Sequence, residues 1–98
     1  MVFDPLQIRI KARTVHVDQT HIPFSPREFD LLVFFARNHG NLLTRMQLLE
    51  HIWNLHFDPQ TNVVDVHVSR LRRKLEAALP EPILHTHRGE GYVFDPTR

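Results

Sequence analysis

"NVVDVHVSRLRRKLE", residues 62–76, decides the fold of this chain because its apolar residues recur at helical spacing. At about 100° per residue, the apolar residues form one narrow stripe that consists of Val64, Val68, Leu71 and Leu75. The opposite face consists of Asn62, Val66, Ser69, Arg70 and Arg73. The pattern therefore predicts a helix, from about Gln60 to Leu79, that is held in the core by one face and exposes the other.

The exposed face of this helix has an unusual composition. Solvated helix faces usually combine Glu with Lys in pairs. Here Asn and Arg predominate, and their hydrogen-bonding forks suit base edges and phosphates, while Val66 suits contact with a thymine methyl group. A solvated amphipathic helix with no ligand is the alternative interpretation.

A first helix is predicted over residues 25–40. Ser25 is a good N-cap, Pro26 suits the first helical position and Glu28 completes a capping box. Gly40 is a typical stop signal. The apolar face of this helix consists of Phe29, Leu32, Val33 and Ala36.

A second helix begins after a short link, with Thr44 as N-cap and Gln47 at the third position. Its apolar side consists of Leu48, Leu49, Ile52 and Trp53. Residues 54–61 form a loop that contains Asp58-Pro59, a pair that can also cap and start the third helix. Two helices joined by a short link are typical of a helix-turn-helix.

Strands are predicted on both sides of the helices. Strict alternation of apolar and polar residues predicts half-buried antiparallel strands at 6–10, 14–18 and 20–24. Residues 83–94 predict a hairpin, with Gly89 and Gly91 supplying its turn. Three strands, three helices and two strands in this order indicate an α+β fold, the winged helix-turn-helix.

The predicted hairpin has Arg88 at its tip. An arginine on a projecting tip can enter a narrow, electronegative minor groove, although a turn can also simply tolerate arginine. A basic helix and a basic hairpin tip together favour a nucleic-acid ligand.

Composition limits the size of the domain, the ligands it can attract and the compartment in which it works. The chain has 98 residues, enough for one domain, a net charge of +1 and no cysteine. The near-neutral charge means that any electrostatic attraction must come from local clustering. The longest apolar run, residues 31–36, is too short to span a membrane, and the N-terminus lacks the organisation of a signal peptide. We therefore expect a cytoplasmic domain, cut from a longer protein, with no membrane contact.

Three segments resemble the DNA-binding effector domain of OmpR/PhoB-type bacterial response regulators: residues 24–53, 61–76 and 83–94. "VDVHVSRLRRKL" and "HRGEGY" are specific in combination, and residues 53–74 look most similar to the copper- and oxidative-stress-responsive branch. The resemblance implies one winged-helix domain over residues 1–98, with a four-stranded N-terminal sheet whose extra strand is "MVF". Phe24 and Ser25 depart mildly from the family pattern, which usually has Leu-Thr there.

The resemblance also implies roles for individual residues. The third helix enters the major groove, where the base contacts are Asp65, Val66 and Arg70. The phosphate and backbone contacts are Trp53, Asn62, His67, Ser69, Arg72, Thr86 and Tyr92, to which the helical spacing adds Arg73. Arg88 is the minor-groove residue of the wing. The loop that contacts RNA polymerase contains Asn54, Leu55, His56, Phe57 and Asp58.

The family implies partners as well. Its members bind double-stranded DNA as pairs on direct-repeat half-sites, so a second copy of the chain is expected on DNA. The other partners that the resemblance implies are RNA polymerase, a receiver domain and a sensor kinase. The receiver, with its phosphoacceptor Asp, is absent from this sequence.

Metal binding and catalysis are the two other classes of function that the residues could support. The chain has eight histidines, and His85 and His87 alternate on one predicted strand, so a metal-binding or protein-interaction module is the alternative. The missing thiols and the lack of a ligand motif argue against a specific site. Ser25 and Ser69 have no recognisable base and acid partners, and no glycine-rich phosphate loop is present. We therefore expect no enzyme activity and no cofactor.

Overall fold

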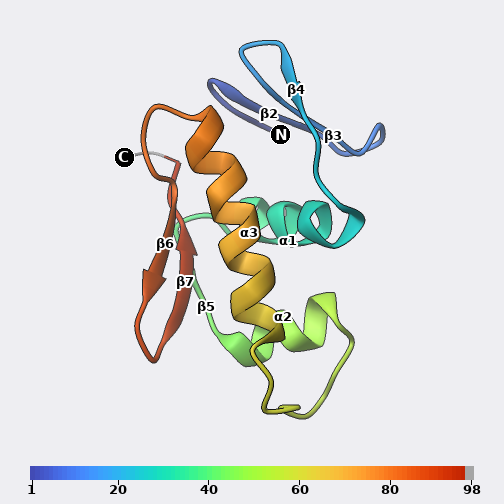
Figure 1. Cartoon of the computed structure of the whole chain (residues 1–98), viewed down its shortest axis with the longest axis vertical. Coiled ribbons are helices and arrows are strands. Elements are labelled where there is room, and N and C mark those ends of the chain that lie inside the picture. The colour runs from blue at the N-terminus through green and yellow to red at the C-terminus, as the bar shows by residue number, and fades with distance from the viewer. Residues whose placement is uncertain (97–98) are drawn as a thin grey trace.

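The computed structural model describes residues 1–96 and confirms the winged helix (Figure 1). A four-stranded antiparallel sheet comes first and contains, in spatial order, β1 (Val2–Phe3), β2 (Leu6–Arg9), β3 (Thr14–Val17) and β4 (Thr20–Ile22). Three helices follow, α1 (Pro26–Arg37), α2 (Arg45–Ile52) and α3 (Val63–Ala78). A three-stranded sheet has the order β5-β7-β6 and contains β5 (Leu42–Leu43), β6 (Leu84–His87) and β7 (Gly91–Phe94).

The N-terminal sheet follows the alternation in the sequence. In β2 and β3 the buried pairs are Leu6 with Val17 and Ile8 with Val15, so one face of the sheet covers the helices. The resemblance correctly implied a fourth strand, which is β1. In the turn between β3 and β4, Asp18 and Gln19 have φ of 48° and 69°, as a two-residue hairpin of the primed type requires.

The capping boxes of α1 and α2 are confirmed, with Ser25 and Thr44 as the N-caps. The core face predicted for α1 is wrong in one position, because Val33 is only half-buried. Leu31 and Phe35 are completely buried instead. The reason is that α1 packs against α2, α3 and β7 at once, so its buried arc is wider than a single stripe.

The start predicted for the third helix is also wrong. α3 begins at Val63, three residues after Gln60, because Gln60 has φ of 56° and lies in the left-handed region. Asp58 does not cap the helix: its Oδ1 accepts a hydrogen bond from the Gln60 backbone N–H at 2.8 Å and stabilises the loop. The predicted apolar stripe, however, is confirmed, since all four of its residues are buried.

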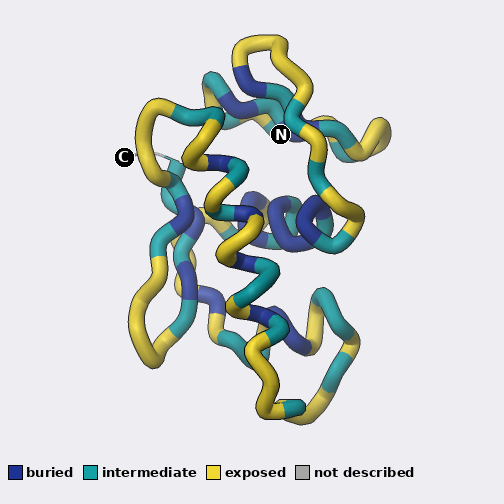
Figure 2. Tube along the Cα trace, in the orientation of Figure 1, coloured by how far each residue is buried: buried dark blue, intermediate teal, exposed yellow. Residues whose placement is uncertain are grey.

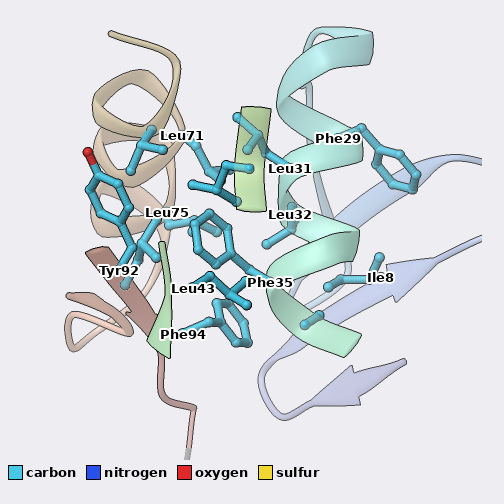
Figure 3. Close-up of a cluster of buried hydrophobic side chains, with 14 of the residues drawn as sticks. Ile8, Phe29, Leu31, Leu32, Phe35, Leu43, Leu71, Leu75, Tyr92 and Phe94 are labelled. Atoms are coloured by element: carbon cyan, nitrogen blue, oxygen red, sulfur yellow. The ribbon is translucent and has the colours of Figure 1, made fainter. Parts of the chain in front are cut away.

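The buried core contains residues of both sheets and all three helices, and Figure 3 shows the part where α1, α3 and the C-terminal sheet meet. Phe35 of α1 sits at its centre and meets the ring of Tyr92 edge-on, with centroids 6.4 Å apart. Leu71 and Leu75 of α3 pack beside them, and Phe94 closes the cluster from β7 (Figure 3). Burial along α3 alternates with exposure (Figure 2), so this helix is anchored by one face and free on the other. No helix within residues 1–96 is long and apolar enough to cross a bilayer.

An ion pair fixes the start of α1 to the C-terminal half of α3. Glu28 is 4% exposed, and its Oε1 accepts hydrogen bonds from Lys74 Nζ at 2.6 Å and from the Ser25 backbone N–H at 2.8 Å. Burial by itself would raise the pKa of Glu28, but the bonds from Lys74 and Ser25 outweigh it and lower that pKa below its ordinary value.

We expect Glu28→Gln to lower the free energy of unfolding by roughly 1–2 kcal/mol at pH 7, because it removes the charge from buried, charge-assisted hydrogen bonds. A lowered folded-state pKa contributes stability above the unfolded pKa of about 4.5 that is lost as pH falls through the folded value. The gap between wild type and variant in urea denaturation should therefore shrink on acidification. Glu50→Gln, at an exposed position of α2, is the matched control and should show no gap. A gap that stays constant with pH would contradict the assignment.

Candidate nucleic-acid interface

The free face of α3 presents a set of polar side chains to solvent. Its exposed residues are Asn62, Asp65, Ser69, Arg70 and Arg73. Val66, His67 and Arg72 are half-buried at the margins of this face. The helical spacing thus predicted four of its five outward residues correctly, and Val66 is less open than expected. Within residues 1–96, Arg70 and Arg73 make no hydrogen bond or ion pair, so both guanidinium groups are available to a ligand.

An open groove of about 470 Å³ separates α3 from the β6–β7 hairpin. One wall is formed by Asp65, Ser69 and Arg72 of α3, and the other by residues 86–92 of the hairpin; Arg45 of α2 also lines the groove. The hairpin lies beside α3 (Figure 1), and its tip consists of Arg88, Gly89 and Glu90. Gly89 is in the turn as predicted, with φ of 73°. Gly91, by contrast, is the first residue of β7.

Four of the predicted DNA contacts are bonded to one another across this groove. The Tyr92 hydroxyl donates to Asp65 Oδ1, and Arg72 Nη2 donates to Thr86 Oγ1. Arg72 Nε is buried with no partner among the described residues. The structure therefore brings these four residues together in two hydrogen-bonded pairs, in which Asp65 and Thr86 are still exposed.

Tyr92 is held as a neutral hydrogen-bond donor. Burial is the main cause that raises its pKa to about 12, and the hydrogen bond to Asp65 and the charge of that carboxylate add to it. Arg72 and Arg45 act in the opposite direction. The phenol therefore keeps its proton throughout the neutral range.

Trp53 and His67 lie together at the other margin of α3. Their rings meet edge-on at 5.3 Å, and the guanidinium of Arg27 lies 5.2 Å from the centre of the Trp53 ring. His67 Nδ1 is 2.9 Å from the Val63 carbonyl oxygen. Sequence reasoning missed Arg27, whose Nη1 donates to the Ile52 carbonyl oxygen, because no pattern in the sequence links residues 25 positions apart.

The predicted polymerase-contact loop is anchored from α2. Arg45 makes an ion pair with Asp58 at 3.0 Å and donates to the Thr61 carbonyl oxygen. Phe57 is 63% exposed at the surface of this loop. Arg45 is a further basic residue missed from the sequence, although its place at the start of a helix, directly after Thr44, was a usable signal.

The rings of His16 and His21 lie 5.4 Å apart, whereas His85 and His87 have no neighbouring set of metal ligands within residues 1–96. His87 is exposed, and His85 is half-buried with an Nε2 that has no partner among the described residues. Within residues 1–96, no three His, Cys, Asp or Glu side chains lie close enough to hold a metal ion. The geometry thus adds no support to the metal-binding alternative.

Residues 18–94 match the protein family described as "Transcriptional regulatory protein, C terminal". A curated relative, the transcriptional regulatory protein PrrA of Mycobacterium leprae, is 45% identical over 90 residues, which cover 92% of this chain. The aligned region is 39% of that relative, so this chain spans well under half its length.

Two solved structures show the extent of the shared fold. The RstA DNA-binding domain of Klebsiella pneumoniae, in complex with the RstA box, has a TM-score of 0.88 at 33% identity and covers 98% of this chain and 96% of its own. The DNA-binding domain of the response regulator AdeR, in complex with an intercistronic region, has a TM-score of 0.84 at 26% identity, with 97% and 98% covered. Both sheets and all three helices are therefore part of the common fold.

Proposed function

The chain belongs to the family of C-terminal domains of transcriptional regulatory proteins, in agreement with its resemblance to OmpR/PhoB-type effector domains, and on this premise we propose that it binds double-stranded DNA in a sequence-specific way. It acts as the output domain of a bacterial two-component regulator. The similarity to the copper- and oxidative-stress-responsive branch remains a prediction.

One observation carries this proposal: α3 is anchored in the core by one face and leaves Asn62, Ser69, Arg70 and Arg73 exposed on the other. An α-helix fits the major groove, and an arginine fork makes bidentate contacts with guanine. The adjacent hairpin ends in the exposed Arg88, which enters a neighbouring minor groove in this proposal.

The contacts divide into two kinds. Arg70 reads a base edge, with Val66 and Asp65 beside it. The contacts to phosphates and the sugar backbone, which position the domain without reading sequence, are Trp53, Asn62, His67, Ser69, Arg72, Arg73, Thr86 and Tyr92. Within residues 1–96 of the DNA-free protein, Arg72 donates to the neutral Thr86 and so keeps an unpaired positive charge for a phosphate, while Tyr92 donates to Asp65.

The proposed partners follow from the family. Two copies bind a direct repeat, where pairing raises affinity through effective concentration. The loop of residues 54–58 contacts RNA polymerase, for which the exposed ring of Phe57 is the natural anchor. A receiver domain, controlled by a sensor kinase, belongs to the longer cytoplasmic protein.

Selection of binding sites from a random pool of DNA duplexes tests the proposed function. Enrichment of one defined motif, present as a direct repeat, is the expected result. Recovery of unrelated sequences with equal affinity would contradict sequence-specific binding, and recovery of a single half-site would contradict the paired arrangement.

We expect Arg72→Ala to weaken binding to all duplexes alike, because a phosphate contact carries no sequence information. The slope of log affinity against log salt should fall by about one unit, since one fewer counterion is released. Arg9→Ala is the control, because Arg9 is exposed on β2 in the N-terminal sheet and should leave the slope unchanged. An unaltered slope in Arg72→Ala would remove it from the phosphate contacts.

A further inference from the structure

We propose that Asp65 is a positioning residue. Through its hydrogen bond with Tyr92 it holds the wing, which is the β6–β7 hairpin of residues 84–94, at a fixed distance and angle from α3. This inference rests on the proposed DNA-binding function and deepens it. It gives Asp65 a task in the DNA-free protein, in addition to the base contact implied by the family resemblance.

Tyr92 is rigid enough to serve as the fixed point. It lies in β7, the central strand of the C-terminal sheet, where it is directly opposite Leu43 of β5 and Thr86 of β6. Its ring is buried and meets Phe35 edge-on, and Tyr92 lines the groove, where its hydroxyl donates to Asp65 Oδ1. Figure 3 shows that oxygen on the α3 side of the core. The bond therefore joins the first turns of α3 to the centre of the wing sheet.

A second bond makes the arrangement stiff. Arg72 lies seven residues after Asp65, which is about two turns and about 10 Å along the same side of the helix. Arg72 donates to Thr86, the residue opposite Tyr92 in the β6–β7 register. Two points on α3 are thus tied to one cross-strand pair, so rotation of the hairpin against the helix would break at least one hydrogen bond.

The hydrogen bond with Tyr92 explains why an acidic residue, Asp65, lies in a basic interface. A carboxylate close to phosphates opposes binding, and Asp65 lies on the exposed side of α3 among Ser69, Arg70 and Arg73. The Asp65 carboxylate is useful because it accepts a hydrogen bond from the Tyr92 hydroxyl. That hydroxyl keeps its proton because burial and the neighbouring Asp65 raise the pKa of Tyr92. Arg88 is only two residues beyond Thr86, so the angle that is fixed at Thr86 decides where Arg88 meets the DNA.

The test measures how much Arg88 contributes to DNA affinity when the Tyr92–Asp65 hydrogen bond is removed. The affinity loss caused by Arg88→Ala is determined in four backgrounds, namely wild type, Tyr92→Phe, Asp65→Ala and Asp65→Asn, on one duplex that wild type has selected from a random pool. Asn keeps an oxygen that can accept from Tyr92, so Asp65→Asn is the conservative rescue. Tyr92→Phe keeps the buried ring, and thermal unfolding confirms that each variant is folded.

We expect Arg88→Ala to cost about tenfold in affinity in wild type and in Asp65→Asn, but threefold or less in Tyr92→Phe and Asp65→Ala, because a loosely held wing loses its minor-groove contact. The loss caused by Arg70→Ala should be the same in wild type and Tyr92→Phe, since α3 itself does not move. An equal Arg88→Ala loss in all four backgrounds would overturn the positioning role while leaving DNA binding intact. A loss below twofold in wild type would also overturn it, and failure of wild type to select any duplex would refute the proposed function itself.

Discussion

Gly91→Ala is expected to lower the free energy of unfolding by roughly 3 kcal/mol or more, and to abolish specific DNA binding at physiological temperature. A Cβ on residue 91 would lie 2.1 Å from the Leu43 carbonyl oxygen and 2.9 Å from its carbonyl carbon, where only backbone atoms could give way. Residue 91 also has φ of 151°, a backbone conformation that residues other than glycine rarely adopt. Because β5 and β7 would have to separate, the wing would lose its attachment. Urea denaturation and a binding titration measure both effects.

Gly89→Ala is the matched control, two residues away in the same hairpin. Gly89 also has a positive φ, of 73°, but a Cβ there would meet nothing within 4 Å. The cost should therefore be limited to backbone strain, about 1 kcal/mol. Equal destabilisation by the two substitutions would show that the contact with Leu43 does not explain the need for Gly91.

Arg70→Ala is expected to reduce affinity for the selected duplex by about 1–3 kcal/mol, roughly ten- to a hundredfold, and to relax preference at one base pair. Arg70 is exposed in the middle of α3, and no hydrogen bond or ion pair within residues 1–96 occupies its guanidinium. A bidentate contact with one guanine would account for the expected loss. The measurement is a footprinting titration on the selected site and on its single-base variants.

Arg73→Ala provides the comparison, because Arg73 is also exposed and lies about one turn further along α3. As a phosphate contact it should weaken every duplex by a similar factor and leave base preference unchanged. Unchanged base preference in Arg70→Ala would remove Arg70 from the base contacts. Relaxed preference in Arg73→Ala would move the base-reading role one turn along the helix.

Local patterns predicted most of the fold. The stripe that begins at Val64 gave the buried face of α3, and the capping boxes of Ser25 and Thr44 gave the starts of two helices. These features depend on residues three or four positions apart, which the sequence displays directly. The alternation in β2 and β3 is similarly local.

Features that depend on distant residues could not be predicted. β5 has only two residues, and it is a strand because it pairs with β7, about 50 positions later in the chain. The role of Gly91 follows from the same pairing. At the site, spacing correctly placed Arg70 on the outer face, but it could not show that Asp65 and Tyr92 are bonded to each other. The sequence predicts that α3 starts near Gln60 because Asp58-Pro59 can cap and start a helix, and it contains no sign of the left-handed φ of Gln60.

The central claim is that α3 reads the major groove while Arg88 occupies the adjacent minor groove. Dimethyl sulfate protection on the selected duplex tests this claim most directly. This reagent modifies guanine N7 in the major groove and adenine N3 in the minor groove. We predict protected guanines and protected adenines about half a helical turn apart, roughly five base pairs. The first set should be lost in Arg70→Ala alone and the second in Arg88→Ala alone. Protection in only one groove, or loss of both sets in either variant, would contradict two separate contacts.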